Sequence, residues 1–528
     1  MCYKWIFLLG LSAMLGACSQ TVDSFDDEDS LEISSSAKKG GSSSSKGGKT
    51  TSSETEELDE ECIGEPGNVW DGTTAKSFAC GSGTKLSPYV ILTAEQLAKL
   101  SFVIGANDKA FQGKYFKLGA DIKLNKGKII DDKGGFVADS AKLHKWTPIG
   151  NSSVSFTGTF DGDGHTVSGM FINTTSTHNG LFGNSSGTVQ NVTVENSWVS
   201  GGKYTAGVVG SNIGTVQNST NLASVSGKEE CVGGVVGISK DKQYLQTSSL
   251  KKLLNKGVVV GLNDVGGVVG FVKNTVIDGL ENFAQVEGSG YVGGVIGGIG
   301  AANLNDIRNL DNYGTVIGQH FVGGVSGYCG GASLNIYTSK QTASYSCSDA
   351  TTWTCGALSN AHNEAHVSGK YYVGGVLGFV CGGKVGSLSN NSDVEGTFGT
   401  AGVVGSAAYV TSKNLYNRGN VYGEVYAGGI FSYNKEGVTS SAYSTGKVDG
   451  DSLVGLMIGY NYNTTMADYY YLEQGEQEPF GLNNGGGVAT SKTAKEMKSK
   501  KFAELLGDDF VYDSEQNDGY PILKWERE

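Results

Sequence analysis

Small and aliphatic residues recur in one short pattern along most of the chain. The pattern is Gly-aliphatic-x-Gly, which first occurs at 180–183 and last occurs, with its first Gly replaced, at 456–459. Successive copies start 27 residues apart, except at three intervals of 33, 30 and 51 residues. A 27-residue unit with insertions explains every interval. A fixed period of this length is typical of a solenoid of stacked repeats.

Within one unit, short runs of alternating apolar and polar residues are separated by Gly and Asn, as in Val216–Val236. This alternation is typical of half-buried strands, and the units contain no stretch with the helical period. Three short strands fit into 27 residues, so each unit is predicted to form one three-sided coil. We therefore predict an all-β fold, a right-handed parallel β-helix (β-solenoid) of about ten 27-residue coils with N- and C-terminal caps. Residues 179–462 would form the repeats, with an insertion at about 333–357.

Two columns of residues appear when the units are aligned. One is an Asn column, in which stacked amides can hydrogen-bond from coil to coil. The other is an aromatic column three residues before the repeated motif; we expect it to fill a corner of the coil, and the alternative is a sugar-binding platform. The adjacent Gly pairs would serve a tight corner with positive φ or a close backbone approach. The Asn column is Asn221, Asn255, Asn282, Asn312, Asn363, Asn390 and Asn417, and the aromatic column is Tyr204, Tyr291, Phe321, Tyr372 and Tyr426.

The N-terminal segment has the features of an export signal. Lys4 precedes an apolar run, Trp5–Leu15, that is too short to span a bilayer. Leu15-Gly-Ala-Cys18 resembles the lipobox of bacterial lipoprotein precursors, which implies removal of residues 1–17, lipidation of Cys18 and no transmembrane helix in the mature protein. The following Ser19 indicates the outer membrane. Residues 18–61 are rich in Ser, Gly and acidic residues and lack the apolar surface to fold, so we expect a disordered tether.

Both ends of the predicted rod differ from the repeats, as solenoid caps do. Residues 62–178 would form an N-terminal cap and the first coils, and Thr93-Ala-Glu-Gln96 is a capping box that opens a short helix. Residues 463–528 would form the C-terminal cap.

The order of several motifs then indicates a family. "LTAEQL", "YFKLGADIKL", "WTPIG", "FTGTFDGDGHTVSGMFI", "GLFG", repeated "GGVVG" and a closing "NDGYPILKW" follow one another over about residues 89–528. This arrangement resembles bacterial surface proteins that carry GLUG-motif repeats, and related repeats occur in the non-catalytic N-terminal regions of IgA-specific metallopeptidases. The resemblance implies a β-helical, adhesin-like surface protein and transfers no catalytic residue.

Seven cysteines remain after the signal and the lipidated residue are set aside, which suits an oxidising compartment. We expect three disulfides, and a buried unpaired thiol at Cys231, which lies on the aromatic column. The expected pairs are Cys62–Cys80, Cys329–Cys381 and Cys347–Cys355.

Candidate metal and catalytic motifs are weak. Asp161-Gly-Asp-Gly-His165 lacks the later ligands of a calcium loop and indicates a tight Asp-Gly turn. In His362-Asn-Glu-Ala-His366, the side chains of His362, Glu364 and His366 would project from the same side of one strand. No fourth metal ligand is in view, so we predict no metal site. Along the column that begins at Ser226, no two adjacent coils both carry an acid, and a catalytic carboxylate pair is therefore not expected there.

The net charge of the chain argues against two classes of binding partner. Asp and Glu number 53 against 40 Lys and Arg, a net charge of −13, which disfavours nucleic acid and anionic membrane surfaces. The sequence thus predicts a lipid-anchored, surface-exposed outer-membrane protein that binds or scaffolds, by adhesion to a glycan or a surface protein, with no cofactor and no enzymatic activity. The alternative is a carbohydrate-active β-helix enzyme, either a polysaccharide lyase or a glycoside hydrolase.

Overall fold

The structure is a computed structural model. It describes residues 62–241, 248–300, 305–331, 333–335, 344–347 and 354–527. The predicted signal peptide, the lipidation site Cys18 and the tether lie outside the described residues.

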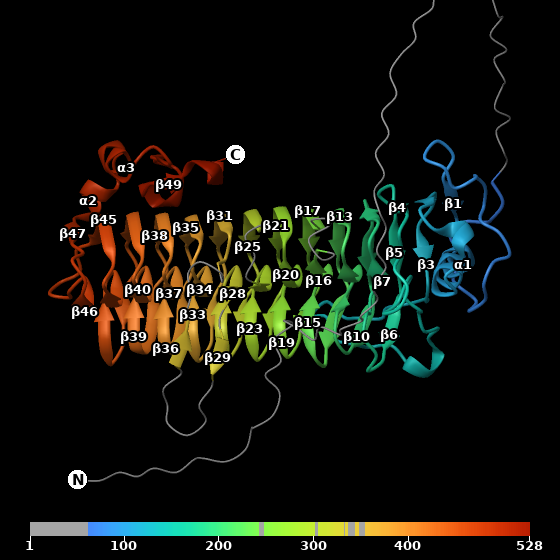
Figure 1. Cartoon of the computed structure of the whole chain (residues 1–528), viewed down its shortest axis with the longest axis horizontal. Coiled ribbons are helices and arrows are strands. Elements are labelled where there is room, and N and C mark those ends of the chain that lie inside the picture. Colours follow the sequence, from blue (N-terminus) through green and yellow to red (C-terminus); the bar gives the residue numbers. More distant parts are fainter. Residues whose placement is uncertain are drawn as a thin grey trace, which may run out of the picture.

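The chain winds into a rod with three faces, each a parallel β-sheet (Figure 1). In one turn, β13 (Thr215–Asn221) lies on the first face, β14 (Ser224–Gly227) and β15 (Glu230–Gly233) on the second, and β16 (Val236–Lys240) on the third. Each strand pairs in parallel with its equivalent one turn later. The predicted all-β solenoid is therefore confirmed, with about 13 turns rather than ten. The count rises because residues before 179 and after 462 also coil.

The first face carries the longest strands. Its other strands are β1 (Tyr89–Ile91), β2 (Tyr115–Leu118), β3 (Ile122–Lys123), β4 (Thr159–Asp161), β5 (Thr166–Ser168), β8 (Thr188–Gln190), β9 (Thr193–Glu195), β17 (Ser248–Asn255), β21 (Thr275–Asn282), β25 (Asp306–Asn312), β31 (Ala357–Asn363), β35 (Lys384–Asn390), β38 (Thr411–Asn417), β41 (Val438–Ser444), β45 (Thr465–Leu472) and β47 (Ala489–Lys492).

The second face has two short strands in most turns. Its other strands are β6 (Phe171–Asn173), β10 (Trp198–Gly201), β11 (Thr205–Ala206), β18 (Val259–Val260), β19 (Asn263–Gly266), β22 (Val286–Glu287), β23 (Gly290–Gly293), β26 (Val316–Ile317), β27 (His320–Gly323), β32 (Val367–Ser368), β33 (Tyr371–Gly374), β36 (Val394–Ala401), β39 (Val421–Gly428), β42 (Val448–Asp449) and β43 (Ser452–Gly455).

The third face is an 11-stranded sheet with one strand in each turn. Its other strands are β7 (Phe182–Ser185), β12 (Val209–Asn212), β20 (Val269–Lys273), β24 (Ile296–Gly300), β28 (Ser326–Gly330), β34 (Leu377–Cys381), β37 (Val404–Ala408), β40 (Phe431–Lys435), β44 (Ile458–Tyr462) and β46 (Phe480–Asn484).

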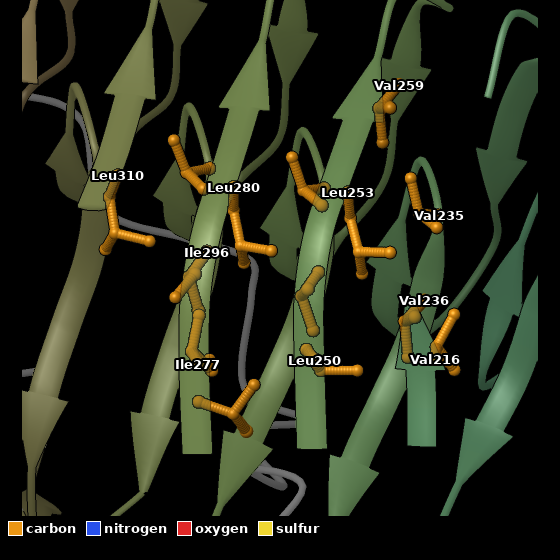
Figure 2. Packing of buried hydrophobic residues seen from close by; sticks show 14 of the residues in the cluster. Val216, Val235, Val236, Leu250, Leu253, Val259, Ile277, Leu280, Ile296 and Leu310 are labelled. Carbon is orange, nitrogen blue, oxygen red and sulfur yellow. The ribbon is translucent and has the colours of Figure 1, made fainter. Parts of the chain in front are cut away.

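The interior of the rod is one continuous apolar core. Val235, Val268, Val295 and Val376, which share a register, are all fully buried in it, as the repeat predicted. Figure 2 shows Leu253, Leu280 and Leu310 side by side on successive strands of the first face, β17, β21 and β25. Equivalent side chains therefore contact one another from turn to turn, and the core has no separate layers.

The predicted Asn column is a buried hydrogen-bonded ladder. Asn282 Nδ2 donates to Asn312 Oδ1 at 2.9 Å, and Asn312 Nδ2 donates to Asn363 Oδ1 at 2.8 Å. The ladder also explains the first Gly of the repeat. A Cβ added at Gly294 would lie 2.3 Å from the Asn312 amide group, and the φ angle of this Gly is not positive. These glycines are therefore required by close approach, not by a left-handed turn.

Left-handed backbone occurs instead at the aromatic column. Tyr204, Tyr291, Phe321, Tyr372 and Tyr426 have φ between 53° and 58°. The rings of Tyr291, Phe321 and Tyr372 stack along the rod; the centroids of Tyr291 and Phe321 lie 5.3 Å apart and those of Phe321 and Tyr372 lie 5.6 Å apart. These three rings and Tyr204 belong to an apolar cluster that is separate from the main core. The column is a stack, as expected, but it does not fill a corner inside the coil.

Two additions flank the rod. At the N-terminal end, α1 (Ala94–Gly105) begins with the predicted capping box of Thr93 and Gln96 and places Leu97 and Leu100 in the core. Short 3-10 turns follow at Lys109–Phe111 and Ser140–Lys142. Among the residues that the structure describes, no helix is long and apolar enough to cross a membrane.

The C-terminal cap begins only after β47, since the turns continue past residue 462. It comprises α2 (Ala494–Met497), α3 (Lys500–Leu506), the antiparallel pair β48 (Phe510–Val511) and β49 (Ile522–Leu523), and 3-10 turns at Asn517–Gly519 and Lys524–Arg527. It folds back along the first face (Figure 1), where Phe502 contacts Tyr443 and Tyr470.

The cysteine pairing was predicted only in part. Cys62 pairs with Cys80, as expected, but Cys329 pairs with Cys355 and Cys347 pairs with Cys381. Cys329 is level with Val380, not with Cys381, so the two residues lie one position apart in register and point to opposite sides of the strand. Cys231 is also disulfide-bonded, which corrects the expectation of an unpaired thiol. Within the insertion, β29 (Ser333–Asn335) and β30 (Ser344–Ser346) form their own antiparallel pair, as an excursion from the rod would.

Candidate functional site

A groove crosses the outer side of the third face at the turn formed by β36 and β37. Its floor is made by three small residues of this turn: Gly399, Ser406 and Ala408. Gly399 takes the place of a ring in the aromatic column, because the register aligns it with Tyr372 of the previous turn and Tyr426 of the next. The small floor residues therefore leave a gap in two rows of large side chains.

The neighbouring turns form the walls. Ser406 lies between Phe379 and Tyr433 in register, and Gly399 lies between Tyr372 and Tyr426. The wall turns are two strand spacings apart, about 9.6 Å. The resulting cavity has a volume of ≈ 300 Å³, at the lower end for small-ligand sites. Above Ser406, between Phe379 and Tyr433, it is wide enough for one flat ring.

Each end of the groove has its own chemistry. At the second face, the Phe398 ring stands edge-on between Tyr372 and Tyr426 and occupies the space above Gly399; its centroid lies 5.6 Å from that of Tyr372 and 5.0 Å from that of Tyr426. At the opposite end, Lys435 Nζ lies 5.3 Å from the centroid of the Tyr409 ring. The groove is thus apolar and aromatic at one end and cationic at the other.

Polar groups along the groove are available to a ligand. Within the part of the chain that the structure describes, the hydroxyls of Tyr426 and Tyr433 make no hydrogen bond. Burial raises the pKa of Tyr433, so its hydroxyl stays protonated and can donate. Burial opposes the charge on Lys435, but its contacts with Tyr409 and Glu436 outweigh this effect and raise its pKa. Lys435 is therefore charged at neutral pH.

One signal for this groove is present in the sequence, within the aromatic column. Position 399 follows Tyr372 by one 27-residue period, so its Gly marks a missing ring. The third-face row carries no such signal, because its members (Phe379, Ser406 and Tyr433) share neither residue type nor size. A gap of this kind becomes visible only when the outward rows of two faces are placed side by side.

The residues of the two weak metal motifs form two different arrangements in the structure. The Asp163 amide donates to Asp161 Oδ1, and Asp163 pairs with Lys117 at 2.9 Å, so this segment is a tight turn. His362 and His366 do not converge, since His362 is buried whereas His366 faces Glu395 at 3.9 Å. No group of three or more ligand side chains suited to a metal occurs among the described residues.

His362 belongs instead to a buried polar cluster beneath the C-terminal cap. His362 Nδ1 lies 2.7 Å from Ser389 Oγ, and His362 Nε2 lies 2.8 Å from Glu364 Oε1. Glu526 of the cap accepts hydrogen bonds from Ser389 and from the Tyr416 hydroxyl, the latter at 2.9 Å. This cluster joins the cap to β31, β35 and β38.

Burial and charge shift the pKa values in this cluster. Burial raises the pKa of Glu526. Burial opposes the charge on His362, but the carboxylates of Glu364 and Glu526 outweigh it and raise the pKa of His362. Asp311, in the same cleft, has its pKa raised to about 6 by burial. Burial also opposes the charge on Glu364, yet its hydrogen bonds with His362 and Asn391 lower its pKa overall.

Comparison with known proteins gives distant relatives only. No family model matches the sequence. Halomucin of Haloquadratum walsbyi is 29% identical over 228 residues, which are 42% of this chain and 2% of halomucin. A provisionally named Gly-rich membrane protein of Evansella cellulosilytica is 33% identical over 126 residues, 23% of this chain and 13% of that protein. The chain therefore spans a small part of the curated relatives it matches.

One solved structure also shows a likeness. A Bacteroides ovatus protein, provisionally assigned as an immunoglobulin A1 protease, is 16% identical and aligns with 85% of this chain and 95% of its own. The TM-score is 0.32, and a likeness at this level carries no argument about function.

Proposed function

We propose that this protein is a lipid-anchored surface scaffold whose rod binds a glycan in the transverse groove between β34 and β40. One observation carries the proposal: a single turn combines small residues at Gly399 and Ser406, and both positions are flanked by rings in the turns before and after. The groove is therefore a local departure from the repeat, not a general property of it.

The chemistry of the groove suits a sugar. A pyranose ring has apolar C–H faces and hydroxyls around its edge, and tyrosine offers an apolar ring with a polar tip. Phe379 and Tyr433 provide ring walls on either side of Ser406, and the hydroxyls of Tyr426 and Tyr433 can bond to the sugar edge. The resemblance to GLUG-motif surface proteins supports the same conclusion.

A groove-filling substitution tests the proposal. Ser406→Tyr would continue the row of Phe379 and Tyr433, and consecutive rings already occur at Tyr433 and Tyr460, so the fold should tolerate it. A screen of immobilised glycans followed by calorimetry with the purified full chain would measure binding. We expect Ser406→Tyr and Tyr426→Ala each to weaken binding at least tenfold, which is about 1.4 kcal/mol.

Tyr422→Ser is the matched control, since Tyr422 is an exposed ring on the second face outside the groove. This variant should bind as the parent does. The proposal fails if the parent binds no glycan, or if Ser406→Tyr binds as tightly as the parent.

The anchor is a separate part of the proposal and rests on the lipobox resemblance at Cys18. Cys18→Ala should block acylation and leave the precursor uncleaved, whereas the parent should incorporate labelled fatty acid and fractionate with the outer membrane. Protease treatment of intact cells should degrade the parent rod if it faces the exterior. Acylation of Cys18→Ala would contradict the assignment.

A second candidate function, glycoside cleavage, has one observation in its favour. The cleft beneath the cap, of ≈ 400 Å³, holds Asp311 and Glu364 beside the rings of Tyr313 and Trp525. The pKa values of the two carboxyls are displaced in opposite directions, which is the arrangement of an acid and its partner base. Release of reducing ends from a polysaccharide by the parent, with loss in Asp311→Asn, would favour this function over binding alone.

A further inference from the structure

The charge distribution of the groove is uneven. Lys435 is the one charged residue among the thirteen that line it, all of which are described, and none of them is acidic. Residues 62–528 contain 41 Asp and Glu against 35 Lys and Arg, a net charge of −6, so a site whose one charge is positive differs from the average of the rod. An anionic ligand would therefore be attracted at this end of the groove.

Lys435 also retains bonding capacity. Its Nζ lies 3.7 Å from Glu436 Oε1, which is longer than a charge-assisted hydrogen bond of about 2.7–2.9 Å. Its side chain is 34% exposed, so it is partly withdrawn from water and its field is less screened than that of a free surface lysine. Lys435 also bonds to Tyr409, so a ligand anion would add to that contact and would displace no tightly bound carboxylate.

The neighbouring ring fixes where this anion would lie. Lys435 Nζ stands over the Tyr409 ring, 5.3 Å from its centroid, at the end of the groove opposite Phe398. A sugar held above Ser406, between Phe379 and Tyr433, would reach this end with one edge. From this geometry we propose that the groove selects an acidic glycan, one whose sugar rings carry carboxylate or sulfate groups, and orients it with an anionic group at Lys435. The inference rests on the proposed function and adds the ligand class to it.

Paired ligands test the inference. Binding of the full chain would be measured with a polyuronate oligosaccharide, with its carboxyl-reduced neutral counterpart, and with a sulfated neutral glycan of similar length. We expect the parent to prefer the polyuronate or the sulfated glycan over the neutral one by about tenfold or more, because a hydrogen bond to a charged group is stronger than a neutral one. The preference should shrink as salt is raised.

Variants assign the preference to one residue. Lys435→Gln should lose the preference while still binding the neutral oligosaccharide, Lys435→Arg should keep it, and Glu436→Gln should increase it. Lys273→Gln is the matched control, since Lys273 ends β20 as Lys435 ends β40 but lies outside the groove. Circular dichroism of each variant should match the parent.

The outcomes separate this inference from the proposed function. Equal binding of neutral and acidic ligands by the parent, or an unchanged preference in Lys435→Gln, overturns the inference and leaves glycan binding intact. Binding to none of the three ligands and to no other glycan overturns both. A preference confined to the sulfated glycan, or to the polyuronate, supports the inference and identifies which anion is bound.

Discussion

The Asn ladder allows the contribution of a single buried side chain to be calculated. Asn312 makes four hydrogen bonds: its Nδ2 donates to Gly314 O and to Asn363 Oδ1, and its Oδ1 accepts from Asn282 Nδ2 and from the Gly314 amide. Each such bond contributes about 0.5–1.5 kcal/mol net. Asn312→Ala should therefore lower the local free energy of unfolding by about 2–6 kcal/mol.

A variant near the end of the ladder is the comparison. Asn417 makes two short bonds, with Asn390 and with Gly419 O, and a third to Ser444 at 3.5 Å that is too long to contribute much. Asn417→Ala should cost about 1–3 kcal/mol by the same count. Both substitutions remove the same atoms from fully buried positions, so the difference reports on the hydrogen bonds.

Native-state hydrogen exchange is the appropriate assay, because a solenoid opens locally and its stability is a sum of nearest-neighbour terms. Amides of β21, β25 and β31 should lose protection in Asn312→Ala, and amides several turns away should not. A loss below about 1 kcal/mol, or an equal loss in Asn417→Ala, would show that the ladder follows from the fold and does not stabilise it.

Two further predictions concern the core and the cap. Val295→Asp places an unpaired carboxylate in the fully buried core and should make turns on both sides sensitive to limited proteolysis, whereas Lys273→Asp should resemble the parent; equal resistance of the two variants would contradict the assigned core face. Glu526 and His362 both have raised pKa values in the folded protein, so each binds its proton more tightly when the cap is docked. Protection factors in the last strand of the cap, which are corrected for the intrinsic exchange rate at each pH, should therefore be larger just below the ordinary histidine pKa of 6.5 than about two units above it. Protection should fall again below 4.5, as Glu364 is protonated, and His362→Gln should weaken the first effect.

Sequence periodicity predicted the rod well because every turn packs equivalent side chains against the turns before and after it. The spacing of the Gly motif, the inward valines and the Asn column all follow from stacking identical coils, so they repeat and can be recognised. The Gly at 294 and the Asn at 312 prove to be one feature, since the side chain of one occupies the space that the other leaves. Because the pattern occurs ten times, an irregular residue in one copy does not hide the period.

Departures from the period were harder to predict. The exchanged disulfides depended on a one-residue offset between Cys329 and Cys381, which identical Cys-Gly-Gly sequences conceal. The folding of the C-terminal cap along the first face depended on Glu526 reaching His362 and Ser389, residues 164 and 137 positions away in the chain. The groove likewise depends on the absence of a side chain at Gly399. Such features depend on tertiary contacts, and no local pattern encodes them.

The left-handed backbone at the aromatic column has a consequence for how such rods diversify. Tyr372, Gly399 and Tyr426 share nearly the same conformation, with φ of 55°, 74° and 57°, although one has no side chain. A ring can therefore be exchanged for a gap without moving the main chain, and the exchange leaves the inward residues untouched. The residues that determine folding and the residues that contact a ligand thus occupy different positions of each 27-residue unit. New binding specificities could arise by altering a few outward residues, at almost any height on the rod, while its architecture is inherited unchanged.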